Sequence, residues 1–333
     1  VLGTESGVLD DYKAVIIADP QLPFSETDKY ILDQYLMQGG RILWVVNGVR
    51  FSEDYLSSEG MTPIVALDLN INDMLFRYGV RVNHALVQDL QCLPVPVDVS
   101  EDANAPNWQP MPWTYAPLLL TSQVSPITRN VSQVRATMAS AIDFVGGEDG
   151  IKKDVLLATS SASKLTATPS KVDLSLGNEQ VEDFKYSFIP IAASLEGIFP
   201  SLYAHLLPPE EITMHAPLLR ESKPTRQVIV AAGSTIRNDW QQGKSLPLGY
   251  DRYTGTQFGN KDFMVNALLY LSDDEGWMQL RKKDFTLRLL NDQRARNARL
   301  VAQMVSIVVP LLLLTVVGVT LLVLKRRKFI HTL

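Results

Sequence analysis

Residues 301–324 carry no charged side chain, and this stretch restricts the possible structures of the chain more than any other. Its sequence is VAQMVSIVVPLLLLTVVGVTLLVL. At about 1.5 Å per residue, a helix of this length extends roughly 36 Å, which exceeds the ~30 Å hydrocarbon core of a bilayer. The stretch therefore predicts a transmembrane helix, with a kink at Pro310. The alternative is a core helix, which would need protein on every face.

Basic residues on both sides of this stretch bear on its orientation. The sequence KRRK at residues 325–328 is typical of the cytoplasmic end of a membrane helix. Arginine residues also precede the stretch, so the charge count favours neither orientation. We predict an extracytoplasmic α/β domain over residues 1–290, a juxtamembrane linker over 291–300 and a cytoplasmic tail over 325–333.

Residues 11–50 have the pattern of a parallel βαβ unit. Residues 14–18 and 41–46 are short apolar runs, as expected of strands that are buried on both faces of a parallel sheet. Ser25 and Asp28 form a capping-box pattern at the start of the intervening helix, and a Gly-Gly pair follows its end. The pattern predicts two adjacent parallel strands joined by a helix.

The edge where these strands end lacks a nucleophile. Ligands of such sheets bind beyond the carboxyl ends of the strands, where Asp19 and Asn47 would lie. Many α/β enzymes carry a reactive side chain at the position of Asn47-Gly48, but neither residue has a thiol or a hydroxyl. We therefore predict that the chain is not an enzyme and has no catalytic residue.

The rest of the domain changes character along the chain. Residues 61–225 contain strand patterns and proline-bearing loops, among them APNWQPMPWTYAP, which its prolines predict to be irregular. A strand at residues 227–232 and a helix over GNKDFMVNALLYLSDD restore the α/β pattern. We expect the core to come from about residues 1–60 and 226–275, with residues 61–225 as added strands and loops.

Other candidate site residues favour structural roles. Cys92 is the single cysteine, which excludes an internal disulfide and a multi-cysteine metal site. Ser234 follows a strand but lacks the second glycine of a G-x-S-x-G turn, so we expect it to act in a turn or helix cap. No pair of histidines has the i, i+4 spacing of a zinc site. The histidines are His84, His205, His215 and His331.

Patterns for nucleotide, calcium and nucleic-acid binding are absent from the sequence. Without a G-x-x-x-x-G-K-[ST] loop, the chain is not expected to hydrolyse ATP, and GGEDG at residues 146–150 has the composition of a polar turn. The net charge of −5 argues against a nucleic-acid binder, and no cofactor or metal is predicted. Four polar residues lack the glycine and distal glutamate of a calcium loop. They are Asp68, Asn70, Asn72 and Asp73.

Four segments carry a resemblance to a known family. They are PFSETDKYILDQYLMQGGRILWVVNG, LNINDMLFRYGVRVNHALVQDLQC, LEGIFPSLY and PLGYDRYTGTQFGNKDFMVNALLYLSDDEGWMQLRKKDFTLRLLN. Together they resemble the GldG-like auxiliary components of gliding-motility-associated ABC transporters of Bacteroidota. The resemblance covers almost the whole chain, including the apolar stretch near its end, and the last segment is the most specific.

The resemblance implies both a fold and a set of partners. The fold would be a class I glutamine-amidotransferase-like (flavodoxin-like) α/β core with added strands and loops, followed by the C-terminal transmembrane helix. The domain would lie in the periplasm, anchored in the lipid of the inner membrane beside an ABC permease subunit and, through it, a cytoplasmic ATPase subunit. Family members usually carry an N-terminal membrane helix as well, and the sequence leaves open whether one precedes Val1.

These observations predict a non-catalytic, membrane-anchored auxiliary subunit of an ABC transporter. Its extracytoplasmic domain would recognise a substrate or partner and couple that event to the permease. Two alternatives remain open at the level of the sequence. One is a membrane-tethered amidotransferase-like hydrolase with a nonstandard site, and the other is a stand-alone binding protein of the cell envelope.

Overall fold

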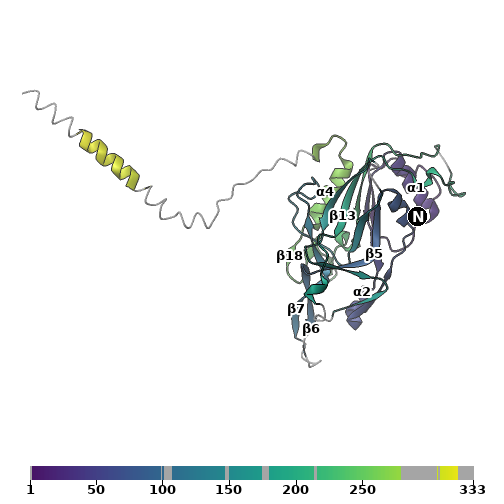
Figure 1. Cartoon of the computed structure of the whole chain (residues 1–333), viewed down its shortest axis with the longest axis horizontal. Helices are drawn as coiled ribbons and strands as arrows, with labels where there is room; N and C mark the ends of the chain where they lie inside the picture. The colour runs from purple at the N-terminus through teal and green to yellow at the C-terminus, as the bar shows by residue number, and fades with distance from the viewer. Residues whose placement is uncertain are drawn as a thin grey trace, which may run out of the picture. The chain divides into compact units, whose positions relative to one another are not determined.

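The structure is a computed structural model that describes most of the 333 residues. The described residues are 2–98, 100, 107–146, 150–174, 180–213, 216–278, 306 and 308–321. The chain forms two units, Val1–Lys282 and Lys283–Leu333. All the described strands belong to the first unit, which Figure 1 draws in purple to green.

An eight-stranded sheet organises the first unit. Its spatial order is β1 (Val15–Ala18), β2 (Ile42–Val45), β14 (Thr225–Val230), β13 (Pro190–Gly197), β10 (Lys152–Ala158), β7 (Trp108–Thr121) and β6 (Cys92–Asp98), with β8 (Val134–Arg135) also paired to β7. β2 pairs in parallel with β1 and with β14. The other pairs of this sheet are antiparallel.

The predicted βαβ unit is confirmed at the parallel edge of the sheet. Between β1 and β2 lies α1 (Glu26–Met37), whose first turn is capped by Ser25. The Ser25 hydroxyl accepts a bond from the Asp28 amide at 3.1 Å and donates to the Asp28 carboxylate at 2.9 Å. Gly40 ends the turn after the helix, where a Cβ would lie 2.5 Å from the carbonyl oxygen of Tyr35. Only glycine fits there.

The predicted class I glutamine-amidotransferase-like, flavodoxin-like α/β core is wrong. The structure is mostly β-sheet with few helices, and only three strands of the main sheet are parallel. Residues 61–225 supply β6, β7, β8, β10 and β13, so these strands belong to the main sheet and are not peripheral additions. Strand patterns reveal local conformation but not pairing partners, which is why the sequence suggested a parallel sheet.

Proline misled the prediction for APNWQPMPWTYAP, because most of this segment is strand β7 rather than an irregular loop. Pro110 and Pro112 lie opposite Pro96 and Pro94 of β6. Since proline has no N–H, the bonds of this hairpin must come from the residues between the prolines, and the proline nitrogens face away from the partner strand. Prolines spaced two apart thus preserve the pairing and leave the outer edge of β6 with fewer donors.

The structure also contradicts the predicted transmembrane helix. Within residues 301–324, helix is described at Ser306 and at residues 308–321. No helix among the described residues is long and apolar enough to cross a membrane. The predicted linker at 291–300 and tail at 325–333 lie outside the described residues.

Smaller elements complete the first unit. Two three-stranded sheets have the orders β11–β5–β9 and β12–β4–β3, and two hairpins pair β15 with β16 and β17 with β18. These strands are β3 (Val49–Arg50), β4 (Met61–Ala66), β5 (Val80–Asp89), β9 (Ser140–Phe144), β11 (Ser163–Ala167), β12 (Ser170–Asp173), β15 (Trp240–Gln241), β16 (Lys244–Ser245), β17 (Tyr250–Asp251) and β18 (Thr256–Gln257). The helices are α2 (Glu53–Glu59), α3 (Asn72–Arg77) and α4 (Asn260–Ser272), with short 3₁₀ turns η1 (Val181–Asp183), η2 (Leu202–Ala204) and η3 (Gly233–Ile236).

Helices cover both faces of the parallel edge. Trp44 of β2 packs in one core cluster with α1 and α3, whereas its neighbours Leu43 and Val45 pack in a second cluster with α4. This alternation follows from the period-two geometry of a strand. The labels α1 and α4 lie on opposite sides of the sheet in Figure 1. A third cluster lies under β6, β7 and the β12–β4–β3 sheet, and it positions the candidate site.

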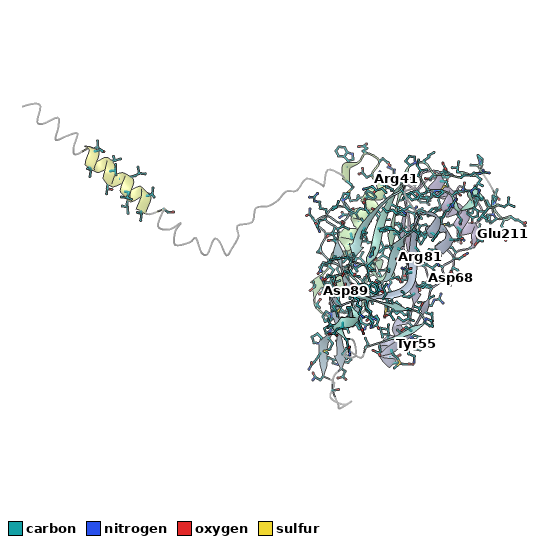
Figure 2. All side chains as sticks on the ribbon, viewed as in Figure 1. Arg41, Tyr55, Asp68, Arg81, Asp89 and Glu211 are labelled. Atoms are coloured by element: carbon teal, nitrogen blue, oxygen red, sulfur yellow. The ribbon has the colours of Figure 1, made fainter. Side chains whose placement is uncertain are left out.

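Charged side chains connect α1 and α4 to neighbouring segments of the chain. Asp33 of α1 is fully buried and accepts bonds from Tyr78, Ser201 and the amide of Leu202; burial raises the pKa of this carboxyl, although the bonds act in the opposite direction. Arg41, labelled in Figure 2, bonds the Leu271 carbonyl at the end of α4. Its guanidinium also pairs with the Asp274 carboxylate at 2.6 Å.

Candidate functional site

The carboxyl ends of the parallel strands are closed by hydrogen bonds. Asn47 follows β2, and its amide nitrogen donates to the Asp19 carboxylate at 2.7 Å. Its amide oxygen accepts from the backbone N–H of Gly233 at 2.8 Å. Asp19 has a backbone φ of +47°, a conformation that residues other than glycine seldom adopt. The structure thus brings together the two residues that the sequence places at this edge.

Gly233 leaves no open space at this edge. A Cβ at this position would lie 2.0 Å from the Asp19 carboxylate and 2.6 Å from the Asn47 amide nitrogen. The backbone of η3 therefore packs directly against both side chains. Asn47 occupies the place of a nucleophile, but its polar atoms join three segments of the chain.

His84 is held by a similar pair of bonds. Its Nδ1 lies 2.8 Å from the Gly48 carbonyl oxygen, which can only accept, so the proton is assigned to Nδ1. Its Nε2 then accepts from the Asn72 side-chain amide at 3.2 Å. Both ring nitrogens are engaged in fixing β5 against the turn after β2, which leaves neither one available to a substrate.

A cavity of about 630 Å³ opens elsewhere in the first unit, and we call it the main cavity. Its volume is within the range of roughly 300–1,000 Å³ typical of small-molecule sites. It has an apolar wall and a polar wall. The apolar wall consists of Phe51, Leu56, Leu93, Pro94, Val95, Pro96, Trp113, Ala116, Ala136 and Leu174. The polar wall consists of Arg135, Thr137, Ser234, Arg237, Asn238, Asp239, Trp240, Asp251, Arg252 and Tyr253.

The apolar wall is an unfilled part of the third core cluster. Leu93, Trp113 and Ala116 are buried members of that cluster, and Phe51, between β3 and α2, packs against it. The Trp113 indole N–H donates to the Asp173 carbonyl oxygen of β12 at 3.3 Å, which fixes the ring between the hairpin and the small sheet. Rigid aromatic surface of this kind can hold an apolar group with little loss of side-chain freedom.

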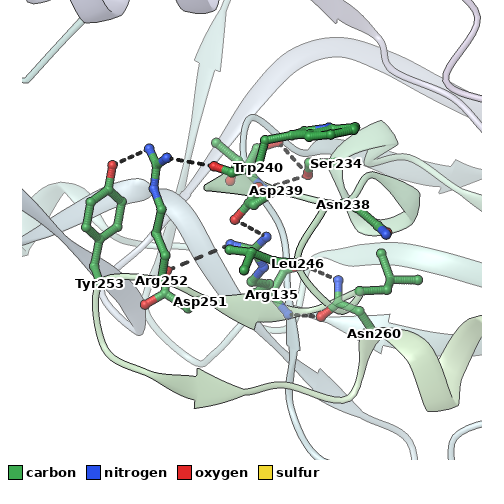
Figure 3. Close-up of polar contacts among 12 residues, drawn as sticks. Arg135, Ser234, Asn238, Asp239, Trp240, Leu246, Asp251, Arg252, Tyr253 and Asn260 are labelled. Atoms are coloured by element: carbon green, nitrogen blue, oxygen red, sulfur yellow. Dashed lines mark hydrogen bonds and ion pairs between the residues drawn. The ribbon is translucent and has the colours of Figure 1, made fainter. Parts of the chain in front are cut away.

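Arg135 organises the polar wall, as Figure 3 shows. Its guanidinium pairs with Asp239 at 2.6 Å and lies 3.8 Å from Asp251. The buried side chain of Asn260, at the start of α4, accepts from the Arg135 amide at 3.0 Å and donates to its carbonyl oxygen at 2.9 Å. Arg135 therefore connects β8, the segment before β15 and the β17–β18 hairpin.

Arg252 lies in the turn between β17 and β18 and differs from Arg135 in its partners (Figure 3). It donates to the Trp240 carbonyl oxygen at 3.2 Å and to the Tyr253 hydroxyl at 2.5 Å. Its guanidinium also lies 4.7 Å from the centre of the Tyr253 ring. Trp240 and Tyr253 are 63% and 52% exposed, so they form an aromatic border at the mouth of the main cavity.

Ser234 is the one candidate residue of the sequence, among those that the structure describes, that lines the main cavity. Its hydroxyl accepts from the Thr137 amide at 2.8 Å and donates to the Thr137 carbonyl oxygen at 3.0 Å. A serine nucleophile needs a base to receive its proton, and here a backbone carbonyl takes that bond. The side chain connects η3 to the segment between β8 and β9.

The other candidate residues that the structure describes do not line the main cavity. Cys92 is half-buried at the start of β6, and His205 is exposed after η2. His215, His331 and residues 147–149 of GGEDG lie outside the described residues. The four polar residues weighed as a calcium loop contact protein groups instead; they are Asp68, Asn70, Asn72 and Asp73. Within the described part of the chain, no group of three or more His, Cys, Asp or Glu residues could hold a metal ion.

Sequence reasoning missed the residues that form the mouth of the main cavity. Asp251, Arg252 and Tyr253 belong to DRYTG, part of the segment that carries the most specific resemblance. An arginine beside an aromatic residue in a glycine-bearing turn is a weak signal of an exposed binding group. Arg135 gave no local signal, because its role depends on segments that are distant in the sequence.

The first unit is thus a β-rich domain in which hydrogen bonds close the carboxyl ends of the parallel strands, and a separate cavity has walls of mixed polarity. The chain belongs to the family described as an ABC-type uncharacterized transport system, which matches residues 2–267. By this membership it is an auxiliary component of an ABC-type transport system, associated with transporter components.

Two further comparisons give little beyond the family. The chain is similar to a solved structure, the mmIFT52 N-terminal domain, with 16% sequence identity, 81% of each chain covered and a TM-score of 0.39. No curated protein matches the chain.

Proposed function

We propose that this chain is a non-catalytic subunit of an ABC transport system and that it recognises a substrate or partner in the main cavity. Family membership supports the transport role. The observation that carries the recognition role is the main cavity, which combines an apolar wall with fixed arginine side chains. Recognition sites for small molecules typically combine these two features.

The contacts of the polar groups support a non-catalytic role. Asn47 and His84 use their polar atoms on neighbouring segments of the chain. Ser234 uses its hydroxyl on Thr137. A nucleophile with an adjacent base is the arrangement that hydrolysis would require, and the hydrolase alternative therefore lacks a supporting contact at these residues.

The finer assignment follows the family resemblance of the quoted segments. In this proposal the first unit lies on the periplasmic side of the inner membrane, beside a permease subunit that binds a cytoplasmic ATPase, in a transport system of the gliding-motility type. Added protease should then digest the first unit in spheroplasts while cytoplasmic control proteins stay intact. Protection of the first unit until the membrane is lysed would contradict the periplasmic placement.

Co-purification tests the assembly. The tagged full chain should recover the permease and ATPase subunits of its own transport system from solubilised membranes, and an unrelated tagged membrane protein should not. Equal recovery by both proteins, or no recovery of a permease by the full chain, would contradict the subunit assignment.

A further inference from the structure

Among the described residues, the groups that contact Arg252 are neutral and do not balance its positive charge. Arg135 is neutralised by Asp239 and stands near Asp251. Arg252 instead contacts the Trp240 carbonyl oxygen, the Tyr253 hydroxyl and the Tyr253 ring, and no carboxylate among the described residues pairs with it. These neutral contacts fix the guanidinium at the mouth of the main cavity and leave further N–H donors for a ligand.

The two carboxylates of the polar wall are already committed. Asp239 pairs with Arg135. Asp251 is buried and accepts from both the amide and the hydroxyl of Thr254, at 2.8 and 2.6 Å. A cationic ligand would therefore have to displace internal contacts, and it would meet the charge of Arg252. A fully apolar ligand would cover Arg252 without supplying an acceptor, which is unfavourable for a charged group.

We infer that the main cavity binds a small amphipathic anion. Its carboxylate or phosphate oxygens pair with Arg252, and its apolar body lies against Phe51, Leu93 and Trp113. Guanidinium groups match the geometry of both kinds of oxygen anion, so Arg252 supplies orientation as well as charge. The aromatic residues of the apolar wall favour a flat or ring-bearing body. This inference rests on the proposed recognition function and names the class of its ligand.

A matched set of probes tests the inference on the full chain by isothermal titration calorimetry. Naphthaleneacetate carries the carboxylate, naphthylmethylphosphonate carries a phosphate-like group, and naphthaleneacetamide has the same ring with a neutral head. At least one anionic probe should bind, and the neutral amide should bind about tenfold or more weakly, because a hydrogen bond to a charged group typically contributes that much. The stronger of the two anions distinguishes a carboxylate ligand from a phosphate ligand.

Three variants locate the binding. Arg252→Gln should weaken the anionic probe by about tenfold to a hundredfold and leave the amide nearly unchanged. Arg81→Gln is the control, since Arg81 is an exposed arginine paired with Asp143 that does not line the main cavity (Figure 2). Val95→Phe, at a half-buried position of the apolar wall, should abolish binding of all three probes. Thermal unfolding checks that each variant is folded.

Equal binding of anion and amide, unchanged binding in a folded Arg252→Gln variant, or no binding of either anion would overturn the inference. Co-purification with the permease tests a separate contact. If the probes fail while the permease is recovered, the ligand class is wrong and the subunit assignment stands. If the anion binds while the permease is not recovered, the ligand class stands and the subunit assignment is wrong.

Discussion

Replacing Asn47 by aspartate should destabilise the fold in a way that depends on pH. Asn47 is 8% exposed, and the Asp19 side chain that accepts its bond is 10% exposed. The change keeps the shape of the side chain and the acceptor for Gly233. It replaces the N–H donor by an oxygen that faces the Asp19 carboxylate across 2.7 Å.

The expected loss follows from two contributions. A hydrogen bond to a charged group is worth about 1.5–3 kcal/mol. Two carboxylates whose centres lie about 4 Å apart repel by about 4 kcal/mol at an effective dielectric constant of about 20. Movement of the side chains will relieve part of this repulsion, so Asn47→Asp should lower the free energy of unfolding by about 3–5 kcal/mol at neutral pH.

Acidification should restore much of this stability, because the two carboxyls can then share one proton. The folded variant binds that proton more tightly than the unfolded chain does, so the loss grows as pH rises and shrinks as pH falls. Asn47→Leu provides the comparison. It leaves the Gly233 amide without an acceptor and should cost about 1–3 kcal/mol at every pH.

Urea unfolding followed by circular dichroism, at about pH 5 and about pH 8, measures both variants against the parent chain. A loss in Asn47→Asp that is the same at both pH values, or that does not exceed the loss in Asn47→Leu at the higher pH, would refute the role given to the Asn47–Asp19 contact.

Three further changes have defined outcomes. Asp33→Asn should lower the free energy of unfolding by about 2–5 kcal/mol, because its amide nitrogen would face donors that now bond a carboxylate oxygen; an unchanged urea midpoint would contradict this. Ser234→Ala should cost about 1 kcal/mol and preserve transport-dependent function, since only the bonds to Thr137 are lost; loss of function in an assembled variant would contradict the purely structural role given to this hydroxyl. Lys13 and Arg41 lower the pKa of Asp274 below its ordinary value of 3.8. The carboxylate of Asp274 is therefore protonated more readily in the unfolded chain than in the folded chain. Its contribution to stability is lost as the pH falls below the ordinary pKa and through the lowered pKa of the folded state. Asp274→Asn should flatten this part of the stability profile, and an identical acid slope would show that the pairs contribute nothing.

The sequence predicted local elements more reliably than their assembly. The β1–α1–β2 unit, the Ser25 cap and helix α4 follow from short-range patterns of apolar, capping and glycine residues. The flavodoxin-like core was wrong because antiparallel strands from residues 61–225 extend the sheet beyond β14, whereas the elements from the two ends of the chain supply only the parallel strands β1, β2 and β14. Pairing of strands far apart in sequence has no local signature.

The candidate site was only half visible in the sequence. Asp19 and Asn47 follow buried strands, and their meeting at one edge could be predicted from parallel pairing. The main cavity could not be predicted, because it forms only where the β6–β7 hairpin, the segments next to the β12–β4–β3 sheet and the turn at Arg252 meet. The alternate prolines of that hairpin predict a loop when one segment is considered alone. They are compatible with a strand because the prolines of β6 lie directly opposite the prolines of β7.

Complementation of a deletion strain tests the central claim most directly, with each variant checked for assembly with the permease. If the chain recognises a ligand in the main cavity and performs no chemistry, Ser234→Ala and Cys92→Ala should restore the parental phenotype. Val95→Phe, which places a larger side chain against the apolar wall of the cavity, should assemble with the permease but fail to restore the parental phenotype. Full rescue by Val95→Phe, or failure of an assembled Ser234→Ala or Cys92→Ala variant, would contradict the account.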